Sequence, residues 1–442
     1  MTVLPYAEKP VDFVIPEPIV GEVLAFTPPE PKSLEETGLA AQEVEALLLK
    51  HLLTGGASTG RRMADVLKLP FGIVHELLRG VKAQLLVNYK SQAQMGDFEY
   101  ELTPEGEARA RYHSDRCTYC GAAPVTLSAY IDSVLKQSVR RVRPKLSDLC
   151  QAFSDLSMAP AMISQIGQAV HAGRGMFIYG SPGNGKTSIA ERVIRAVSQH
   201  VWVPRTITVS GEIIRVFDPA NHEEAPLAAG SAILSDSNFD RRWVRIRRPS
   251  IIVGGELRME HLELTSNPAT GIIEAPVQLK SNCGALVVDD FGRQRMTTTE
   301  LLNRWIIPLE KGYDFLSLPS GRQIQVPFDQ LMVFSTNLEP HKLVDEAFLR
   351  RIPYKLEVSD PTPREFKELV KQWCAKLGLE YSEEALQHWL EEHYKKPGRA
   401  MRYCHPRDLV NQVKTFCEFH DLPMVLTSKG VDVAARNYFA GL

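Results

Sequence analysis

The chain has 442 residues, of which 44% are hydrophobic and 24% charged, values typical of a globular protein with about two or three domains. The formal net charge of −2, from 51 basic and 53 acidic residues, excludes a polycation, so nucleic-acid contact would need a local basic patch. Seven scattered cysteines argue against a disulfide framework. Without a signal peptide or an apolar run of about 18 residues, we expect a cytoplasmic protein with no membrane insertion.

Residues 1–37 are rich in proline and glutamate, and proline at this density blocks helices and central strands. We therefore expect an extended arm. Residues 38–115 carry a different pattern, with apolar residues at helical spacing that predict three helices. Two short strands are expected next, Leu85–Tyr89 and one around Tyr100, and Thr103-Pro104 predicts the start of a closing helix.

Three helices, a two-stranded wing and a closing helix resemble a winged-helix domain. Residues 38–115 hold nine Lys or Arg and ten Asp or Glu, whereas a domain that reads DNA normally shows a basic face. We favour a protein-docking role for this domain and keep nucleic-acid binding open.

Residues 116–145 are expected to form a connector with a helix near Leu127–Val139.

A phosphate-binding pattern, G-x-x-x-x-G-K-[ST], spans Gly180 to Thr187. The apolar run 176–179 before it predicts a buried strand and residues 188–197 after it predict a helix, which is the context that the pattern requires. Lys186 would neutralise β- and γ-phosphate oxygens, and the Thr187 hydroxyl oxygen would bind Mg²⁺. The residues expected to bind the nucleotide are Gly180, Ser181, Pro182, Gly183, Asn184, Gly185, Lys186, Thr187 and Ser188.

Two acidic residues follow a second apolar strand, at 285–288. Asp289 is expected to hold Mg²⁺ through water, and Asp290 to orient or deprotonate the attacking water. A third apolar strand, 331–335, ends close to Asn337, whose amide is placed to bind the water or the γ-phosphate. Three arginines complete the candidate catalytic residues: the adjacent Arg350 and Arg351, and Arg407 near the start of a helix.

These motifs, in this order, resemble those of the AAA+ ATPases over about residues 146–442. The resemblance implies an α/β fold, in which a parallel αβα P-loop core (146–360) is followed by a helical lid (361–442), with helices starting at Pro363, Ser382, Pro406 and Ser428. It also implies ATP and Mg²⁺ as cofactors and a homo-oligomeric ring, most often a hexamer, with ATP between subunits. Arg350 or Arg351 would then reach into a neighbour's site, and Arg407 would report the nucleotide state to the lid.

Two further segments narrow the resemblance. Residues 314–326 are expected to form a hairpin with its turn at Pro319–Gly321, and residues 211–282 to form an insertion. Together with Leu301–Trp305 they resemble the helix-2-insert clade, which includes MoxR-type ATPases and sigma-54 activators, in which such segments face the ring pore. The tip at Leu264–Gly271 lacks the Gly-Ala-Phe-Thr-Gly-Ala loop of the activators, so we set sigma-54 binding aside.

Two features depart from a simple interpretation. Many AAA+ relatives carry glutamate where this chain has Asp290, and aspartate is one methylene shorter, so hydrolysis is expected to be slow. Five arginines crowd residues 241–248. They could contact nucleic acid, or they could form a solvated or inter-subunit face.

Our leading hypothesis is an ATPase that remodels a client protein. The alternatives are a DNA-associated ATPase, for DNA loading or transcription control, and a slow nucleotide-dependent scaffold.

Overall fold

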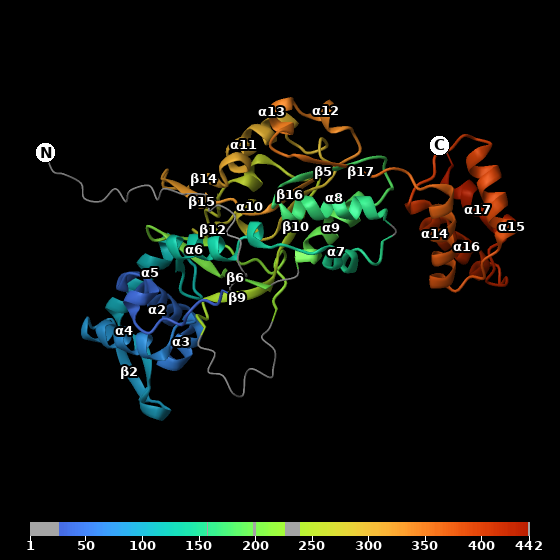
Figure 1. Cartoon of the computed structure of the whole chain (residues 1–442). Helices are drawn as coiled ribbons and strands as arrows, with labels where there is room; N and C mark the ends of the chain where they lie inside the picture. Colours follow the sequence, from blue (N-terminus) through green and yellow to red (C-terminus); the bar gives the residue numbers. More distant parts are fainter. Residues whose placement is uncertain (1–25, 157, 198–199, 226–238, 441–442) are drawn as a thin grey trace.

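The computed structural model describes residues 26–156, 158–197, 200–225 and 239–440 (Figure 1). Most of the arm expected over residues 1–37 lies outside these ranges. Residues 34–37 form a helical turn, α1 (Leu34–Thr37), so the extended conformation expected there is wrong. The Ser33 hydroxyl accepts a hydrogen bond from the Glu36 N–H, and Gly38, at φ 71°, ends the turn in the left-handed conformation.

Five parallel strands form the central sheet, in the order β10-β13-β16-β5-β17. They are β5 (Met176–Tyr179), β10 (Ser250–Val253), β13 (Ala285–Val288), β16 (Leu331–Thr336) and β17 (Tyr354–Glu357). Every residue of β13 and β16 is buried, which explains their uninterrupted apolar sequences. The strands predicted at 176–179, 285–288 and 331–335 are confirmed.

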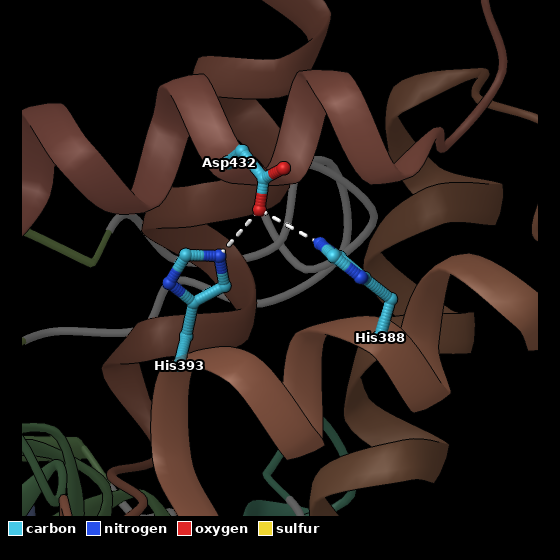
Figure 2. Close-up of side chains that lie close together, drawn as sticks. All are labelled: His388, His393 and Asp432. Carbon is cyan, nitrogen blue, oxygen red and sulfur yellow. Dashed lines mark hydrogen bonds and ion pairs between the residues drawn. The ribbon is translucent and has the colours of Figure 1, made fainter. Parts of the chain in front are cut away.

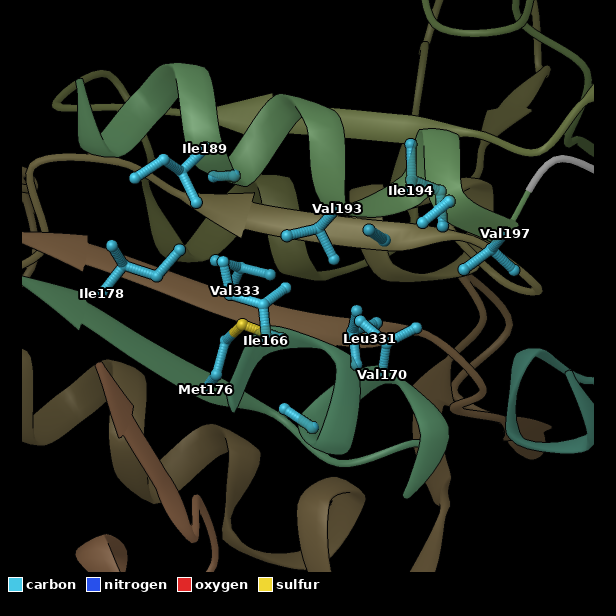
Figure 3. Close-up of a cluster of buried hydrophobic side chains, with 14 of the residues drawn as sticks. Ile166, Val170, Met176, Ile178, Ile189, Val193, Ile194, Val197, Leu331 and Val333 are labelled. Atoms are coloured by element: carbon cyan, nitrogen blue, oxygen red, sulfur yellow. The ribbon is translucent and has the colours of Figure 1, made fainter. Parts of the chain in front are cut away.

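Helices cover both faces of this sheet, giving the αβα layers of the predicted fold class. Alternate residues along each strand point to opposite faces. One face packs against α7 (Leu146–Ala152), α8 (Pro160–His171) and α9 (Lys186–Val193), as Figure 3 shows for Ile166 and Ile189 against Val333. The other face packs against α11 (Thr298–Lys311) and α13 (Glu346–Leu349), through Trp305 and Phe348.

Residues 211–282 are not a single insertion, because they contain β10. This strand pairs along the edge of β13, with Ile251 opposite Leu286, and the Pro249 carbonyl accepts the Ala285 N–H at 2.9 Å. Buried N–H groups at the edge of β13 need such partners, and residues 250–253 supply an edge strand in which Ile251 and Val253 are buried and Ile252 is exposed. The expectation of one continuous insertion is therefore wrong.

A second sheet, of mixed direction, lies beside the core in the order β11-β12-β8-β7-β4. Its strands are β4 (Val125–Thr126), β7 (Thr206–Val209), β8 (Glu212–Arg215), β11 (Thr265–Ser266) and β12 (Ile273–Glu274). The helix expected near 127–139 is present as α6 (Leu127–Gln137). Because β4 belongs to this sheet, residues 116–145 are built into it and are more than a connector.

Two antiparallel pairs accompany the second sheet. Strand β6 (His200–Pro204) pairs with β9 (Trp243–Arg247). The hairpin predicted at 314–326 is confirmed as β14 (Tyr313–Ser317) and β15 (Gln323–Pro327). Its turn is closed by a 2.8 Å bond from the Leu318 N–H to the Arg322 carbonyl, and Gly321 takes φ 82°.

The N-terminal domain and the C-terminal helices lie at opposite ends of the core (Figure 1). The first contains α2 (Ala41–Gly55), α3 (Gly60–Leu67), α4 (Phe71–Ala83) and α5 (Pro104–Arg116), with a three-stranded sheet ordered β1-β3-β2. These strands are β1 (Ser58–Thr59), β2 (Val87–Gln92) and β3 (Phe98–Leu102). Thr103 caps α5, as predicted, by accepting the Gly106 N–H at 3.0 Å.

The lid consists of α14 (Pro363–Leu377), α15 (Glu383–Leu390), α16 (Cys404–Phe419) and α17 (Ser428–Tyr438), with starts within two residues of those expected. A π-helical turn, Glu391–Lys395, continues directly from α15. Thr362 and Glu365 form a capping box at the start of α14. Among the helices described, none has the length and apolar character needed to cross a membrane.

Candidate functional site

The loop between β5 and α9 carries the phosphate-binding pattern. Gly180, Gly183 and Gly185 take φ values of 143°, 84° and 79°, which side chains rarely adopt. A Cβ atom on Gly180 would lie 2.4 Å from the Val358 carbonyl oxygen, and one on Gly183 would lie 2.6 Å from the Cys404 Sγ. Gly180 and Gly183 therefore require glycine for both conformation and space, whereas Gly185 requires it for conformation alone.

Lys186 lies at the centre of this loop, at the N-terminus of α9. Its Nζ donates to the carbonyl oxygens of Gly180 and Ser181, each at 3.0 Å, and to Asn337 Oδ1 at 2.7 Å. Burial lowers the pKa of the Lys186 ammonium, while the nearby carboxylates of Asp289 and Asp290 act in the opposite direction. The lysine and Asn337, 151 residues apart in the chain, thus meet at one point.

The expected metal-binding pair lies next to the lysine. Thr187 Oγ1 donates to Asp289 Oδ2 at 2.8 Å. The hydroxyl and the carboxylate, which come from two separate segments, therefore lie side by side. The Asp289 N–H donates to the Val253 carbonyl at 2.8 Å, and its own carbonyl accepts from Gln294 Nε2 at 2.9 Å. Hard oxygen donors in this arrangement fit Mg²⁺, which prefers a few carboxylate or hydroxyl ligands together with phosphate oxygens.

Asp290 follows in an unusual backbone conformation. Its φ is 47°, in the left-handed region that aspartate tolerates better than most side chains. The Asp290 carboxylate is exposed and accepts from Asn337 Nδ2 at 3.3 Å. Asn337 therefore bridges the ammonium of Lys186 and the carboxylate of Asp290, and the three polar groups form a continuous chain across the loop.

Asn184 joins the phosphate-binding loop to the lid, a role that its place in the motif did not predict. Its Nδ2 donates to Asp360 Oδ1 at 2.7 Å, and its Oδ1 accepts the Tyr403 N–H at 3.3 Å. Asp360 also pairs with Arg402, and the Cys404 N–H donates to the Gly183 carbonyl at 3.0 Å. No spacing signal in the sequence marks Asp360 or Tyr403, since Asn184 lies 176 and 219 residues earlier in the chain.

A cavity of about 800 Å³ opens over these groups, a size suited to a nucleotide. The P-loop residues from 182 to 188, together with Asp289, Asp290 and Asn337, provide its polar side. Its apolar side comes from the lid, from α8 and from the segment before α8; the residues are Leu156, Met158, Met162, Leu369 and Trp373. The cavity thus combines a phosphate end with a surface on which a base can pack.

The three candidate arginines are placed differently. Arg407 lines the cavity and pairs with Asp408 at 2.7 Å. Arg350 and Arg351, which follow α13, are not among the described residues that line it. Arg351 pairs with Glu310 at 2.6 Å and is partly buried, whereas Arg350 is exposed. Of the two, Arg350 is the one available to another molecule.

The arginine run at 241–248 is used mainly within the chain. Buried Arg242 pairs with Asp240 at 2.7 Å, and buried Arg248 donates to the carbonyls of Gln137 and Cys283. On β9, Val244 and Ile246 are buried while Arg247 is exposed, because alternate residues of a strand point to opposite faces. Most of the run therefore binds other parts of the fold, and its buried members Arg242 and Arg248 form neither a nucleic-acid contact nor a solvated or inter-subunit face.

His405 lies in the first turn of α16, the lid helix that carries Arg407. Burial, assisted by the positive charge of Arg402, lowers the pKa of His405 from 6.5 to about 4, and the Tyr394 hydroxyl lies 2.8 Å from Nδ1. In the unfolded chain the imidazole gains its proton near pH 6.5, whereas in the folded chain it stays neutral until about pH 4. The stability contributed by neutral His405 is therefore complete above pH 6.5 and is lost as the pH falls to about 4.

We expect the free energy of unfolding to fall in this window by up to about 1.4 kcal/mol per pH unit on account of His405. Urea denaturation of the full chain at several pH values between 7 and 4, followed by tryptophan fluorescence, measures this slope. His405→Gln should be less stable at pH 7 but should have a flatter pH dependence. Equal slopes for the two proteins would contradict the assignment.

Similarity to known proteins is limited to one family over part of the chain and to distant solved structures. Residues 362–437, most of the lid, match a family described as a domain of unknown function (DUF8689). No curated protein matches the chain. Similar solved structures include the RuvB Holliday junction branch migration motor of Thermotoga maritima (12% identity, TM-score 0.37, 64% of this chain and 70% of RuvB). NtrX from Brucella abortus in complex with ATP shows 13% identity and a TM-score of 0.40, covering 65% of this chain and 60% of NtrX.

Because these TM-scores are low, the fold is assigned from the chain's own strand order and helix layers. The P-loop strand β5 lies between β17 and β16, and the Asp289 and Asn337 segments follow β13 and β16, the next two strands along the sheet. This parallel αβα core with a helical lid is the fold class predicted from the sequence.

Proposed function

We propose that this chain is an AAA+ ATPase that binds ATP with Mg²⁺, hydrolyses it between neighbouring subunits of a ring, and thereby remodels a client protein. The observation that carries the proposal is the convergence of Lys186, Thr187, Asp289, Asp290 and Asn337. These residues come from three separate segments, yet they are joined by hydrogen bonds of 2.7 to 3.3 Å at the phosphate end of one cavity.

The chain's own groups account for binding and positioning. Backbone N–H groups of the P-loop and the N-terminus of α9 face the phosphates, and Lys186 adds a positive charge. Thr187 and Asp289 would hold Mg²⁺, which when bound neutralises phosphate charge. Asp290 Oδ1 and Asn337 Nδ2, which are 3.3 Å apart, would both bind an attacking water that lies beside them. The short aspartate reaches less far than glutamate, which favours a low turnover.

The proposed site between subunits is supported by Arg350. Transferring a phosphoryl group spreads negative charge over the γ-phosphate oxygens, and an arginine supplied from a neighbour stabilises that charge. Arg350 is exposed and lies away from its own cavity, whereas Arg351 is held by Glu310. A head-to-tail ring, in which one surface of each subunit meets a different surface of the next, brings such a residue into the adjacent site. A hexamer is the size that the AAA+ resemblance favours.

Client remodelling is supported by the β14–β15 hairpin. Phe315 on this hairpin is 46% exposed, which is unusual for a large aromatic side chain. Arg304 of α11 pairs with Asp314 at 2.5 Å, so the hairpin is tied to the helix that follows the Asp289–Asp290 strand. We propose that hydrolysis at Asp290 moves α11 and the hairpin together against a client. In this proposal the hairpin faces the pore of the ring, as the resemblance to MoxR-type ATPases implies.

The N-terminal domain is proposed as a winged-helix-like docking module. Two of its basic side chains pack on aromatic rings of the same domain: Lys82 lies 3.0 Å from the ring centroid of Tyr89, and Arg61 lies 4.6 Å from that of Phe71. These side chains are less available to a phosphate backbone. The domain therefore favours a protein partner, and we carry the DNA-associated hypothesis no further.

Turnover measured against protein concentration tests the central proposal. If the site is completed by a neighbour, ATP hydrolysis per subunit should rise steeply over the concentration range in which the chain assembles, as followed by light scattering. Asp290→Asn is the matched control, because it should assemble with ATP while hydrolysing little. Turnover per subunit that stays constant while the chain dissociates would contradict a shared site.

A further inference from the structure

Two histidines and one aspartate converge on the lid, away from the nucleotide cavity (Figure 2). His388 Nε2 lies 2.8 Å and His393 Nε2 2.7 Å from the same oxygen, Oδ1 of Asp432. We propose that these three side chains form a binding site for a divalent transition-metal ion, with zinc as the first candidate. This site is independent of the ATPase proposal, because none of its residues lines the described nucleotide cavity.

A local departure from α-helical geometry creates the site. His388 lies in α15, and in a regular helix the residues that share its face are three or four positions away. The π-helical turn at Glu391–Lys395, marked by a 3.0 Å bond from the Lys396 N–H to the Glu391 carbonyl, adds one residue to a turn. It therefore brings His393, five positions on, to the same side as His388. Such π turns occur frequently at functional sites.

The direction of each histidine is set by its buried neighbour. Trp389 and Tyr394, the residues after His388 and His393, are almost fully buried and pack edge to face on Phe366. Their burial turns both imidazoles outward, toward α17. The Arg399 guanidinium also donates to the His393 carbonyl at 2.8 Å, which anchors the end of the π turn. The two nitrogen donors are consequently held in place by the lid core.

The donor set suits a transition metal. The ligand atoms of the three side chains all lie within 4.8 Å of one another, and two imidazole nitrogens with one carboxylate oxygen are typical ligands of zinc and related ions. The side chains of His388, His393 and Asp432 are 32%, 20% and 41% exposed, so a fourth position is open to water or to a ligand from solvent. The ion would replace the two Nε2 protons, and each neutral imidazole would keep its proton on Nδ1.

An ion here would join α15 and the π turn to α17. Asp432 lies 39 and 44 residues from the histidines, so coordination closes a long loop within the lid. Helix α17 in turn contacts α16, where the Tyr438 hydroxyl donates to Asp408 Oδ2 at 3.2 Å. Metal binding is therefore expected to stabilise the lid against unfolding.

Titration of the chelator-treated full chain with Co²⁺, without nucleotide or Mg²⁺, tests the proposal. Wild-type protein should bind one equivalent whose visible d–d absorption disappears when Zn²⁺ is added. His388→Ala and His393→Ala should each weaken this binding by at least about tenfold, because each removes a direct ligand. Asp432→Asn, which keeps the shape and the acceptor oxygen, should also weaken it. The matched control is His420→Ala, since His420 is an exposed lid histidine outside the cluster.

The thermal unfolding midpoint in excess Zn²⁺ gives a second readout. It should rise for the wild type and for His420→Ala, and not for the three site variants. Equal Co²⁺ affinity in all five proteins would overturn the proposal. A spectrum dominated by thiolate charge transfer and unchanged in the histidine variants would also overturn it, because it would assign the metal to the free cysteines.

Discussion

Lys186→Ala is expected to weaken ATP binding by at least about a hundredfold and to reduce turnover to background. The Lys186 side chain is 7% exposed, and its Nζ is already fixed by three oxygens of the loop and Asn337 within 3.0 Å. The ammonium therefore meets the phosphates without first being ordered. A hydrogen bond to a charged group contributes about 1.5 to 3 kcal/mol, and one ammonium can serve two phosphate oxygens.

Binding of a fluorescent ATP analogue and release of phosphate measure the two effects separately. Lys367→Ala is the matched control, because Lys367 lies on the lid surface and pairs with Glu383 at 2.6 Å. That variant should bind and hydrolyse ATP as the wild type does. ATP affinity within a few fold of wild type in Lys186→Ala would show that the cavity is not an ATP site of the P-loop kind.

Arg350→Ala is expected to lower turnover by about a thousandfold or more while leaving ATP binding intact, the effect of removing an arginine supplied in trans. The reason is its location: Arg350 is exposed and outside the described lining of its own cavity. Arg351→Ala, the adjacent comparison, should chiefly reduce stability, because it breaks the 2.6 Å pair with Glu310. Phosphate release and analogue binding, measured on both variants, distinguish these outcomes.

Mixing Arg350→Ala with Asp290→Asn subunits tests whether the arginine acts in trans. Each variant alone lacks one half of every shared site. In a head-to-tail ring assembled at random from equal amounts, about a quarter of the interfaces join an intact Asp290 to an intact Arg350. Part of the activity should then return. If mixing restores nothing, the arginine acts within its own subunit or Arg351 has the role assigned to Arg350.

Much of the fold could be predicted from local patterns. The strands at 285–288 and 331–335 are apolar throughout because both faces of the sheet are covered, and the lid helices begin at capping residues such as Thr362 and Ser382. The strand β10 was missed within the expected insertion. Four apolar or small residues do not reveal whether they pair with a central sheet or with a separate one.

The sequence by itself determined the phosphate-binding loop, because glycine, lysine and threonine must recur there at set spacing for the backbone to approach phosphate. It also pointed to Asp289, Asp290 and Asn337, since the ends of parallel strands meet at one edge of the sheet. Only the tertiary structure decided which contacts these residues make, including the 2.7 Å bond between Lys186 and Asn337.

Tertiary structure alone also separated exposed Arg350 from paired Arg351, and linked Asn184 to Asp360. It further brought Asp432 to His388 and His393, which are five residues apart and do not show the spacing of a metal motif on a regular helix. The physical reason is common to these cases. A side chain's local sequence sets its backbone conformation, but its partner is chosen by packing between segments tens to hundreds of residues apart.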